Sequence, residues 1–497
     1  MMTGQFRSEI SLRAPGRILI GADWIEPTGP TVDLVDPATE EPLYSLALAG
    51  TAEVDLAVRA ARAAFDRGPW PTMTPAERAV ILRRFAELIR VRAGDYAALW
   101  TSQTGVPLAL SQGAAAPSVD LIQYYAALAE SYEFAQVRAV GPHAISKAAI
   151  VASEPVGVVA AITPWNGPLQ GMLMKLAPAL AAGCTVIMKP ASETPLECFL
   201  LAEAAEDAGF PPGVVNLLPA DRDVSDLLIR HEGVDKVSFT GSTAAGLHIA
   251  SVVGARLGRY TMELGGKSAA IVLEDYDAAV LAPTLARIVT RNSGQVCLNF
   301  SRVLVPKNKH DEYVEALGDA MGAVKVGDPW DLETQMGPLA FRQHYERVFG
   351  FINRGRASGA QLVTGGQRPV GLECGYFVEP TLFANATNDM EISQQEIFGP
   401  VATVIPYDDI DDAIAIANDS DYGLSGAVFT NDTDAAYRIA RRVRTGGVTQ
   451  NGRDLDTRNP FGGFKKSGVG REGGPEGFEE YLEKKSIFLP ALPTELM

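Results

Sequence analysis

The stretch VGVVAAITPWNGPLQGMLMKLAPALAAGCTVIMKP, residues 156–190, decides the fold class. It begins with an apolar run at 156–163, continues through a segment of helical character at 168–181, and returns to an apolar run at 184–189. A strand, a helix and a second strand in this order form a βαβ unit, whose strands run parallel. Strands that are continuously apolar are covered on both faces, as in parallel sheets. The stretch therefore predicts an α/β protein built on a parallel sheet.

The alternation of strands and helices continues to residue 264 and then begins again. Two such series predict two α/β domains, and each sheet is expected to bind ligands beyond the carboxyl ends of its strands. The first series adds strands at 214–219, 236–241 and 260–264 and helices at 195–208, 223–231 and 243–256, and upstream helices are predicted at 53–66 and 74–100. The second series has helices at 277–291, 309–323, 341–358, 411–418 and 433–443 and strands at 301–306, 360–366, 401–407 and 426–430.

Local signals mark helix starts and the segments outside the two series. TPAE (74–77) and TPLE (194–197) both carry an N-cap threonine and a capping-box glutamate. Residues 132–153 alternate like a hairpin around Gly141-Pro142, EKKSIFLP (483–490) is a terminal strand, and 446–475 is Gly-rich and loop-like. Pairing of the hairpin and the terminal strand with another subunit and packing on their own chain are equally compatible with the pattern.

Composition narrows the function class. The chain has 497 residues, enough for two or three domains, and its formal net charge of -17 argues against binding to nucleic acid or to anionic membranes. The first residues lack the apolar core of a secretory signal, and no apolar run reaches the ~18 residues of a membrane span. Four cysteines without a CxxC pair and five histidines make a disulfide framework or a structural metal site unexpected. We expect a cytoplasmic protein without a metal.

Polar residues directly follow several strands of the first series. Asn166, Lys189, Gly241 and Glu263 each stand at such a strand end. The carboxyl ends of parallel strands meet at one edge of a sheet. Cys297 lies downstream, in a Gly-flanked loop that opens the second series. We expect these residues to converge on one cleft between the two domains.

Each of these residues also has an ordinary structural explanation. The turn FTGSTAAG (239–246) leads into a helix and offers free N–H groups to an anion, but most such turns are plain connections, and the tight GxGxxG fingerprint is absent. Asn166 can donate to an oxyanion or simply form a turn, and Glu263 can be a base or an exposed carboxylate. Taken by itself, Cys297 would be interpreted as a small buried apolar residue, and so would Cys184, Cys198 and Cys374. Only the combination of these residues favours a catalytic site over the structural explanations.

The chain resembles the aldehyde dehydrogenase superfamily over essentially its whole length. The matching motifs occur in the order of that family: TPWNGP (163–168), MKPASETP (188–195), FTGSTAAG (239–246), MELGGKSA (262–269), GQVC (294–297), EIFGP (396–400) and PFGGFKKSGVGRE (460–472). The resemblance implies a Rossmann-like cofactor domain at 1–131 and 154–263 and a catalytic domain at 264–480. It also implies a small β oligomerisation element at 132–153 and 481–497, which gives homodimers or homotetramers.

The resemblance also assigns catalytic roles. Cys297 is the nucleophile, which forms a thiohemiacetal and then a thioester, and the Asn166 amide and the Cys297 N–H form the oxyanion hole. Glu263 activates the water that hydrolyses the thioester, and Lys175 and Glu472 match positions that relay protons. Because Glu263 replaces a histidine as the base, we expect the Cys297 thiolate to be favoured by backbone N–H groups and the nicotinamide cation.

The resemblance places the cofactor and the substrate as well. Lys189 is expected on the adenine ribose, Ser242 on the pyrophosphate, and Glu396 on the nicotinamide ribose. The full cofactor set is Ile162, Thr163, Pro164, Trp165, Lys189, Ser192, Glu193, Phe239, Gly241, Ser242, Leu264, Gly265, Glu396 and Phe398. The substrate tunnel would be lined by Gly167, Gly171, Met174, Val296, Leu298, Leu455 and Phe461.

The chain departs from the family pattern at two places. Ser192 stands where many relatives carry the glutamate that repels the 2′-phosphate of NADP, with Glu193 one residue later. We therefore expect NAD as the main cofactor with NADP tolerated. Gly167 and Gly171 stand where many relatives carry bulkier side chains, and none of the tunnel positions is an arginine. These features predict medium or long-chain, or bulky hydrophobic, aldehydes rather than semialdehyde carboxylates.

Two other enzymatic functions and a non-catalytic role fit parts of the same sequence. A CoA-acylating semialdehyde dehydrogenase shares the scaffold but typically lacks the glutamate at 263. A cysteine-dependent thioester hydrolase needs a histidine beside Cys297, and the nearest in sequence is His310. A non-catalytic descendant would be expected to have lost Cys297 or Glu263.

Overall fold

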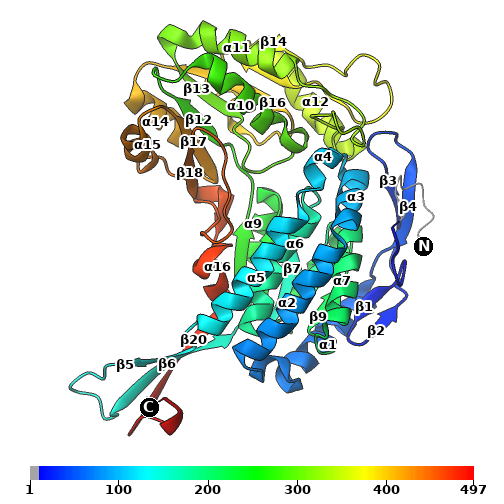
Figure 1. The fold of residues 1–497 in the computed structure, drawn as a ribbon, viewed down its shortest axis with the longest axis vertical. Helices are drawn as coiled ribbons and strands as arrows, with labels where there is room; N and C mark the ends of the chain where they lie inside the picture. The colour runs from blue at the N-terminus through cyan, green and yellow to red at the C-terminus, as the bar shows by residue number, and fades with distance from the viewer. Residues whose placement is uncertain (1–9, 497) are drawn as a thin grey trace.

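A computed structural model describes residues 10–496. Figure 1 shows two α/β bodies, one above the other, and a β hairpin that projects from the lower one. Each body is built on a mixed, mostly parallel sheet, which confirms the predicted fold class. The first nine residues of the proposed cofactor domain lie outside the described part.

The lower body contains a six-stranded sheet of order β19-β11-β10-β7-β8-β9. β7, β8, β10 and β11 run parallel, so their carboxyl ends form one edge: Ile162 pairs with Lys189, and Thr240 pairs with Glu263. Helices α6 and α7 both pack against α2, and α5 packs against α2 and α6. Helix α8 packs against α1 and α9, and these three helices form a second group. The strands are β7 (Val158–Ile162), β8 (Thr185–Lys189), β9 (Val215–Leu217), β10 (Lys236–Thr240), β11 (Arg259–Glu263) and β19 (Gly468–Val469). The helices are α1 (Thr51–Arg67), α2 (Pro75–Val91), α3 (Ala93–Thr104), α4 (Leu108–Ser111), α5 (Ala115–Ser131), α6 (Pro168–Ala182), α7 (Leu196–Ala208), α8 (Arg222–Arg230), α9 (Thr243–Ala255) and α16 (Gly474–Glu479).

The upper body contains a seven-stranded sheet of order β14-β15-β16-β13-β12-β17-β18. Its strands are parallel except for β14, which runs antiparallel to β15. The strands are β12 (Ala269–Val272), β13 (Arg302–Pro306), β14 (Gln361–Thr364), β15 (Thr381–Ala384), β16 (Val401–Tyr407), β17 (Ser425–Phe429) and β18 (Gly447–Gln450). The principal helices are α10 (Ala278–Thr290), α11 (His310–Gly322), α12 (Arg342–Ala357), α14 (Ile410–Asn418) and α15 (Thr433–Ala440).

The projecting hairpin forms a third sheet of order β20-β6-β5 (Figure 1). β5 (Ala135–Arg138) and β6 (Ala148–Pro155) are the two strands predicted around Gly141-Pro142. β20 (Leu482–Leu489) pairs antiparallel with β6 along its whole length, so the terminal strand packs on its own chain. Two small ribbons near the N-terminus complete the fold: β1 (Ile18–Ile20) with β2 (Asp23–Ile25), and β3 (Thr31–Val35) with β4 (Pro42–Ala47).

The structure corrects several predicted elements. Residues 74–100 are two helices rather than one, because Arg92 leaves helical geometry at φ -100° and ψ 19°. The capping box at Thr74 forms, but the one at Thr194 does not: the Thr194 hydroxyl donates to the Trp165 carbonyl, 3.1 Å away. Strands β12, β15 and β18 and helices α5 and α16 were not predicted. Short strands contain too few residues for an alternating apolar pattern to be recognised. This is the case for β18, inside the Gly-rich segment at 446–475.

Two absences hold for residues 10–496. Within this range no helix is both long and apolar enough to cross a membrane. The same residues bring together no group of three or more histidine, cysteine, aspartate or glutamate side chains suited to hold a metal ion.

Candidate active site

The strand ends of the lower sheet and the loop of Cys297 enclose one cavity. Its volume is about 180 Å³. Asn166, Cys297 and Glu472 lie in its wall, together with Thr240 at the end of β10. All the residues predicted for the substrate also line it: Gly167, Gly171, Met174, Val296, Leu298, Leu455 and Phe461. The structure thus brings together residues that are more than 300 positions apart in sequence.

The loop before Cys297 has an unusual backbone. Asn292, Ser293 and Gly294 are consecutive residues with φ of 48°, 55° and 74°. Such left-handed geometry is costly for the two non-glycine residues and persists only where surrounding contacts hold it. The Ser293 hydroxyl donates to the Gly337 carbonyl at 2.8 Å, and a Cβ on Gly294 would lie 2.1 Å from the Gly399 carbonyl carbon. Packing between the loop and the upper body therefore sets the position of Cys297.

Asn166 is held where an oxyanion donor is needed. Its side-chain amide donates to the Gln295 carbonyl at 2.9 Å. Its own carbonyl accepts from the Trp100 indole and from the Asn292 amide, each at 3.0 Å. A primary amide has two N–H donors. One is therefore engaged on Gln295, and the second remains for an oxygen bound in the cavity.

The Cys297 thiol is protonated in the cofactor-free protein. Burial, reinforced by the Glu396 carboxylate, raises its pKa to about 12. The Leu298 N–H and the Arg453 cation act in the opposite direction but do not compensate. The Leu298 N–H favours the thiolate, as expected, but without cofactor the desolvation of the thiolate outweighs it.

Glu263 lies at the end of β11 in a dry environment. Both of its carboxylate oxygens are buried and have no hydrogen-bond partner. Burial, with the Glu472 carboxylate nearby, raises the pKa of Glu263 well above its usual value. A Cβ on Gly462 would lie 2.5 Å from Glu263 Oε1, so only glycine leaves room for this carboxyl. The pKa of a general base is commonly raised by burial in this way.

A chain of polar groups leads away from the cavity. Lys175 is fully buried in α6 and forms an ion pair with Glu472. Its ammonium also donates to the Thr240 hydroxyl at 2.6 Å. Because Glu472 influences the pKa of Glu263, the two carboxyls and the lysine lie within electrostatic reach of one another. The arrangement can carry a proton between the cavity and the interior.

The edge of the lower sheet fits a dinucleotide. Ser242 is the N-cap of α9: its hydroxyl accepts from the Ala245 N–H at 3.3 Å, and the helix start supplies free N–H groups for a pyrophosphate. A Cβ on Gly241 would lie 2.4 Å from the Phe239 ring, so a larger residue here would have to displace that ring. Lys189 ends β8, where Thr163 N–H donates to its carbonyl at 3.1 Å.

The adjoining loops complete this edge. The Ser192 hydroxyl donates to Glu193 Oε2 at 3.2 Å, so these two exposed side chains interact with each other. The Ser467 carbonyl accepts from the Leu264 N–H at 2.9 Å, and its hydroxyl donates to the Gly265 carbonyl at 2.6 Å. Ile162, Thr163 and Pro164 continue from β7 into the loop that carries Trp165.

Glu396 and Phe398 come from the upper body and face the same edge. Glu396 Oε1 accepts from the Gly266 N–H at 2.9 Å, and burial raises the pKa of Glu396. The Phe398 ring packs edge-on against Trp165, with ring centroids 5.4 Å apart. The Arg347 guanidinium holds the Glu396 and Ile397 carbonyls, each at 2.6 Å. All predicted cofactor residues therefore lie at or beside the carboxyl edge of one sheet.

Sequence reasoning missed part of the cavity wall. Trp100 and Tyr96 enter from α3, and Arg291 and Arg453 enter from the upper body. The expectation of an arginine-free wall is therefore wrong. Arg291 follows α10, and its spacing from Arg287 places both on one helix face, a signal that could have been read from the sequence. Arg453 lies in an irregular loop, and only the tertiary structure brings it to the cavity.

Comparisons with known proteins agree with this geometry. The model of the family described as "Aldehyde dehydrogenase family" matches residues 24–487. Geranial dehydrogenase of Castellaniella defragrans is 44% identical over 95% of this chain and 98% of its own length. A crystal structure of Mycobacterium tuberculosis aldehyde dehydrogenase complexed with NAD⁺ has a TM-score of 0.92 at 42% identity, covering 96% of this chain and 98% of that one. A mutant aldehyde dehydrogenase C from Pseudomonas syringae, crystallised with NAD⁺ and octanal, has a TM-score of 0.91 at 38% identity and covers 97% and 98% of the two chains.

Proposed function

Because the chain belongs to the aldehyde dehydrogenase family, we propose that it oxidises an aldehyde to the carboxylic acid with NAD as hydride acceptor. The observation that carries the proposal is the convergence of Cys297, Asn166 and Glu472 on one cavity beside a helix N-terminus suited to a pyrophosphate. Cys297 and Asn166 act on the substrate carbonyl, and Glu472 exchanges a proton with Glu263.

In the first step the Cys297 thiol loses its proton to water in the cavity, and its sulfur forms a bond to the aldehyde carbon. The C=O π electrons move to the oxygen, which gives the oxyanion of a thiohemiacetal. The developing oxyanion receives the second Asn166 N–H and the Cys297 backbone N–H, because donors aimed at developing charge lower the barrier. NAD, when bound, supplies the acceptor for the hydride that leaves the same carbon. Loss of that hydride leaves a thioester on Cys297, and splitting the reaction in this way makes two easier steps.

In the second step Glu263 removes a proton from the water that attacks the thioester. Burial raises the pKa of this carboxyl, and a proton that it holds can pass to the Glu472 carboxylate, which the Lys175 ammonium holds in an ion pair. The Cys297 thiol then leaves and the carboxylic acid is released. The presence of Glu263 supports hydrolysis rather than transfer of the acyl group to coenzyme A. Release of free acid without added coenzyme A tests this directly.

For the cofactor we propose NAD as the main dinucleotide, with NADP tolerated. The support is Ser192, which offers no charge against a 2′-phosphate, while the Glu193 carboxylate is engaged by the Ser192 hydroxyl. NAD is also bound in the structural relatives described above. A kcat/KM for NADP below about a thousandth of the NAD value, a gap of roughly 4 kcal/mol, would contradict tolerance.

For the substrate we propose an aldehyde with a medium or long apolar chain or a bulky apolar group. Gly167 and Gly171 support this: a Cβ on Gly167 would meet nothing within 4 Å, and one on Gly171 would meet its nearest atom at 3.9 Å. The names of two relatives, one acting on geranial and one crystallised with octanal, point the same way.

The deciding experiment measures NADH and NADPH formation over a panel of aldehydes, with Cys297→Ala as the blank. We expect hexanal and aromatic aldehydes to exceed acetaldehyde in kcat/KM. Equal NADH formation by the Cys297→Ala variant would remove the basis of the mechanism. The chain is further proposed to form homodimers or homotetramers through 132–153 and 481–497, which a molar mass in solution tests.

A further inference from the structure

Trp100 on α3 contacts the loop of the oxyanion donor and also borders the substrate cavity. Its indole N–H donates to the Asn166 main-chain carbonyl at 3.0 Å, and the residue lines the cavity that contains Cys297. A tryptophan that only filled the core would be fully buried, whereas Trp100 is half-buried and its polar N–H is engaged. This placement indicates a role in the site itself.

The Asn166 carbonyl is held by two donors from different bodies. Trp100 approaches it from the lower body, and the Asn292 side-chain amide approaches it from the loop before Cys297, also at 3.0 Å. A carbonyl oxygen has two lone pairs, so both of its acceptor positions are used. Rotation of the peptide unit after Asn166 would break both hydrogen bonds. The two donors therefore restrict the backbone from which the Asn166 side chain extends.

The helix that carries Trp100 is fixed in place at its C-terminal end. Gly105 ends α3 with a φ of 76°, and a Cβ on it would lie 2.5 Å from Pro338 Cγ. The Pro338 carbonyl accepts from the Ser293 hydroxyl at 3.0 Å, so the segment that α3 contacts also holds the nucleophile loop. Because α3 is anchored in this way, the indole can set the position of Asn166 rather than follow it.

The Asn166 side chain has little freedom of its own. One amide N–H is engaged on the Gln295 carbonyl at 2.9 Å, which leaves the second for the oxyanion. Such a donor is effective only when it is aimed at the developing charge, and a misplacement of about 1 Å can cost about 10²-fold in rate. We propose that Trp100 is a positioning residue, whose indole N–H holds Asn166 in the orientation that stabilises the oxyanion. This inference rests on the proposed dehydrogenase function and adds to it a residue that acts through Asn166.

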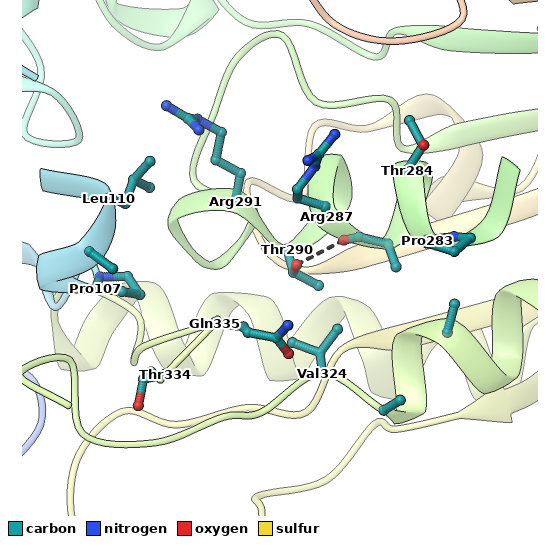
Figure 2. Close-up of a pocket in the computed structure, with 14 residues that line it drawn as sticks. Pro107, Leu110, Pro283, Thr284, Arg287, Thr290, Arg291, Val324, Thr334 and Gln335 are labelled. Carbon is teal, nitrogen blue, oxygen red and sulfur yellow. Dashed lines mark hydrogen bonds between the residues drawn. The ribbon is translucent and has the colours of Figure 1, made fainter. Parts of the chain in front are cut away.

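A role for Trp100 as a plain apolar wall would look different in kinetics. The wall of the inner cavity continues at Leu110, which also lines an outer cavity of about 720 Å³, shown in Figure 2. Loss of a wall contact would affect aldehydes with a long chain, because acetaldehyde has only a methyl group beside its carbonyl. Positioning of Asn166 affects the carbonyl oxygen, which every aldehyde has. Chain length therefore separates the two roles.

The test measures the rate of NADH formation in the first turnover, at saturating NAD⁺ and saturating acetaldehyde or hexanal. Trp100→Phe keeps an aromatic ring without the N–H and should lower this rate about tenfold for both aldehydes. Trp100→Met should lower the rate by the same factor and, because it lacks the ring, raise the KM of hexanal further. Trp24→Phe is the matched control: it removes an indole N–H that donates to Glu206 at 3.2 Å, and it should leave the rate unchanged.

A double-mutant cycle tests whether Trp100 acts through Asn166. Asn166→Ala should lower the first-turnover rate by about 10²- to 10³-fold. Adding Trp100→Phe to it should change the rate by less than about twofold, since the group that Trp100 positions is then gone. A further tenfold loss in the double variant, a loss for hexanal alone, or an unchanged rate in Trp100→Phe would each overturn the inference.

Two controls separate the inference from misfolding and from the proposed function. The melting temperature and the Kd of NAD⁺ should match the wild type in Trp100→Phe and Trp100→Met. If the rate in both variants falls only in proportion to the loss of folded protein, Trp100 has a structural role and the inference is wrong. If the wild type yields no NADH from any aldehyde in the panel, the proposed function itself fails.

Discussion

The reactivity of Cys297 should depend on pH and cofactor in a way that its environment determines. With a pKa of about 12, only roughly 3 in 10⁵ of the thiols are ionised at pH 7.5 in the cofactor-free protein. A thiol with an ordinary pKa of about 8.5 is roughly one-tenth ionised at that pH. Restoring the ordinary value would thus raise the thiolate fraction by roughly 3 × 10³. Lower nucleophilicity of the less basic thiolate cancels part of this and leaves a net gain of roughly 10².

NAD⁺ is expected to produce that gain. Its nicotinamide carries a positive charge. A ribose bound by Glu396, as the resemblance implies, would draw away the carboxylate that otherwise helps to raise the pKa of Cys297. Without NAD⁺, alkylation of Cys297 by iodoacetamide should rise about tenfold per pH unit from pH 7 to 10 without a plateau. At pH 7.5, saturating NAD⁺ should accelerate it by roughly 10².

The assay measures iodoacetamide adducts by mass spectrometry in a Cys374→Ser background, which removes the exposed thiol. Cys184 and Cys198 are fully buried and should stay unmodified. Cys297→Ala is the blank. A plateau with a midpoint below pH 9 in the absence of NAD⁺, or a rate that NAD⁺ leaves unchanged, would refute the reasoning.

Other predictions concern single side chains. Glu263→Gln should keep a first-turnover burst of NADH while steady-state turnover falls by about 10²- to 10⁴-fold; complete loss of the burst would make Glu263 the activator of Cys297 instead. Gly462→Ala should lower the free energy of unfolding by about 1–3 kcal/mol in urea titrations, because its Cβ would lie 2.5 Å from Glu263 Oε1 at a φ of +151°; unchanged stability would contradict this. Burial raises the pKa of Glu197 to about 8 from 4.5, so the folded state favours its neutral form and loses stability as pH rises between these values. Glu197→Gln should therefore gain up to about 5 kcal/mol relative to the wild type between pH 4.5 and 8, and a constant difference over that range would contradict the assignment.

Much of the fold could be predicted from local sequence patterns, because the formation of helices and strands depends largely on residues that are neighbours in sequence. The apolar runs at 158–162 and 185–189 are strands on any parallel sheet, and their order with α6 predicts the βαβ unit. The positions of the strand ends follow from the same apolar runs. For this reason Asn166 and Glu263 could be placed at one edge of the predicted sheet. The capping box at Thr74 is equally local. The break at Arg92 was not predicted; the Arg92 side chain bonds there to Asp95, three residues on, and to Glu203, far along the chain.

By itself, the sequence determined the α/β class, the two sheets, the strand-end residues and, through its motifs, the resemblance that assigns Cys297 and Glu263. The tertiary structure alone decided the state and surroundings of those groups. Burial, which no local pattern encodes, raises the pKa of both the Cys297 thiol and the Glu263 carboxyl in the cofactor-free protein. Arg453 enters the cavity wall from an irregular loop, so its position beside Cys297 depends on how the two bodies pack. A cavity is enclosed by segments distant in sequence, and its charge is therefore a property of the packing.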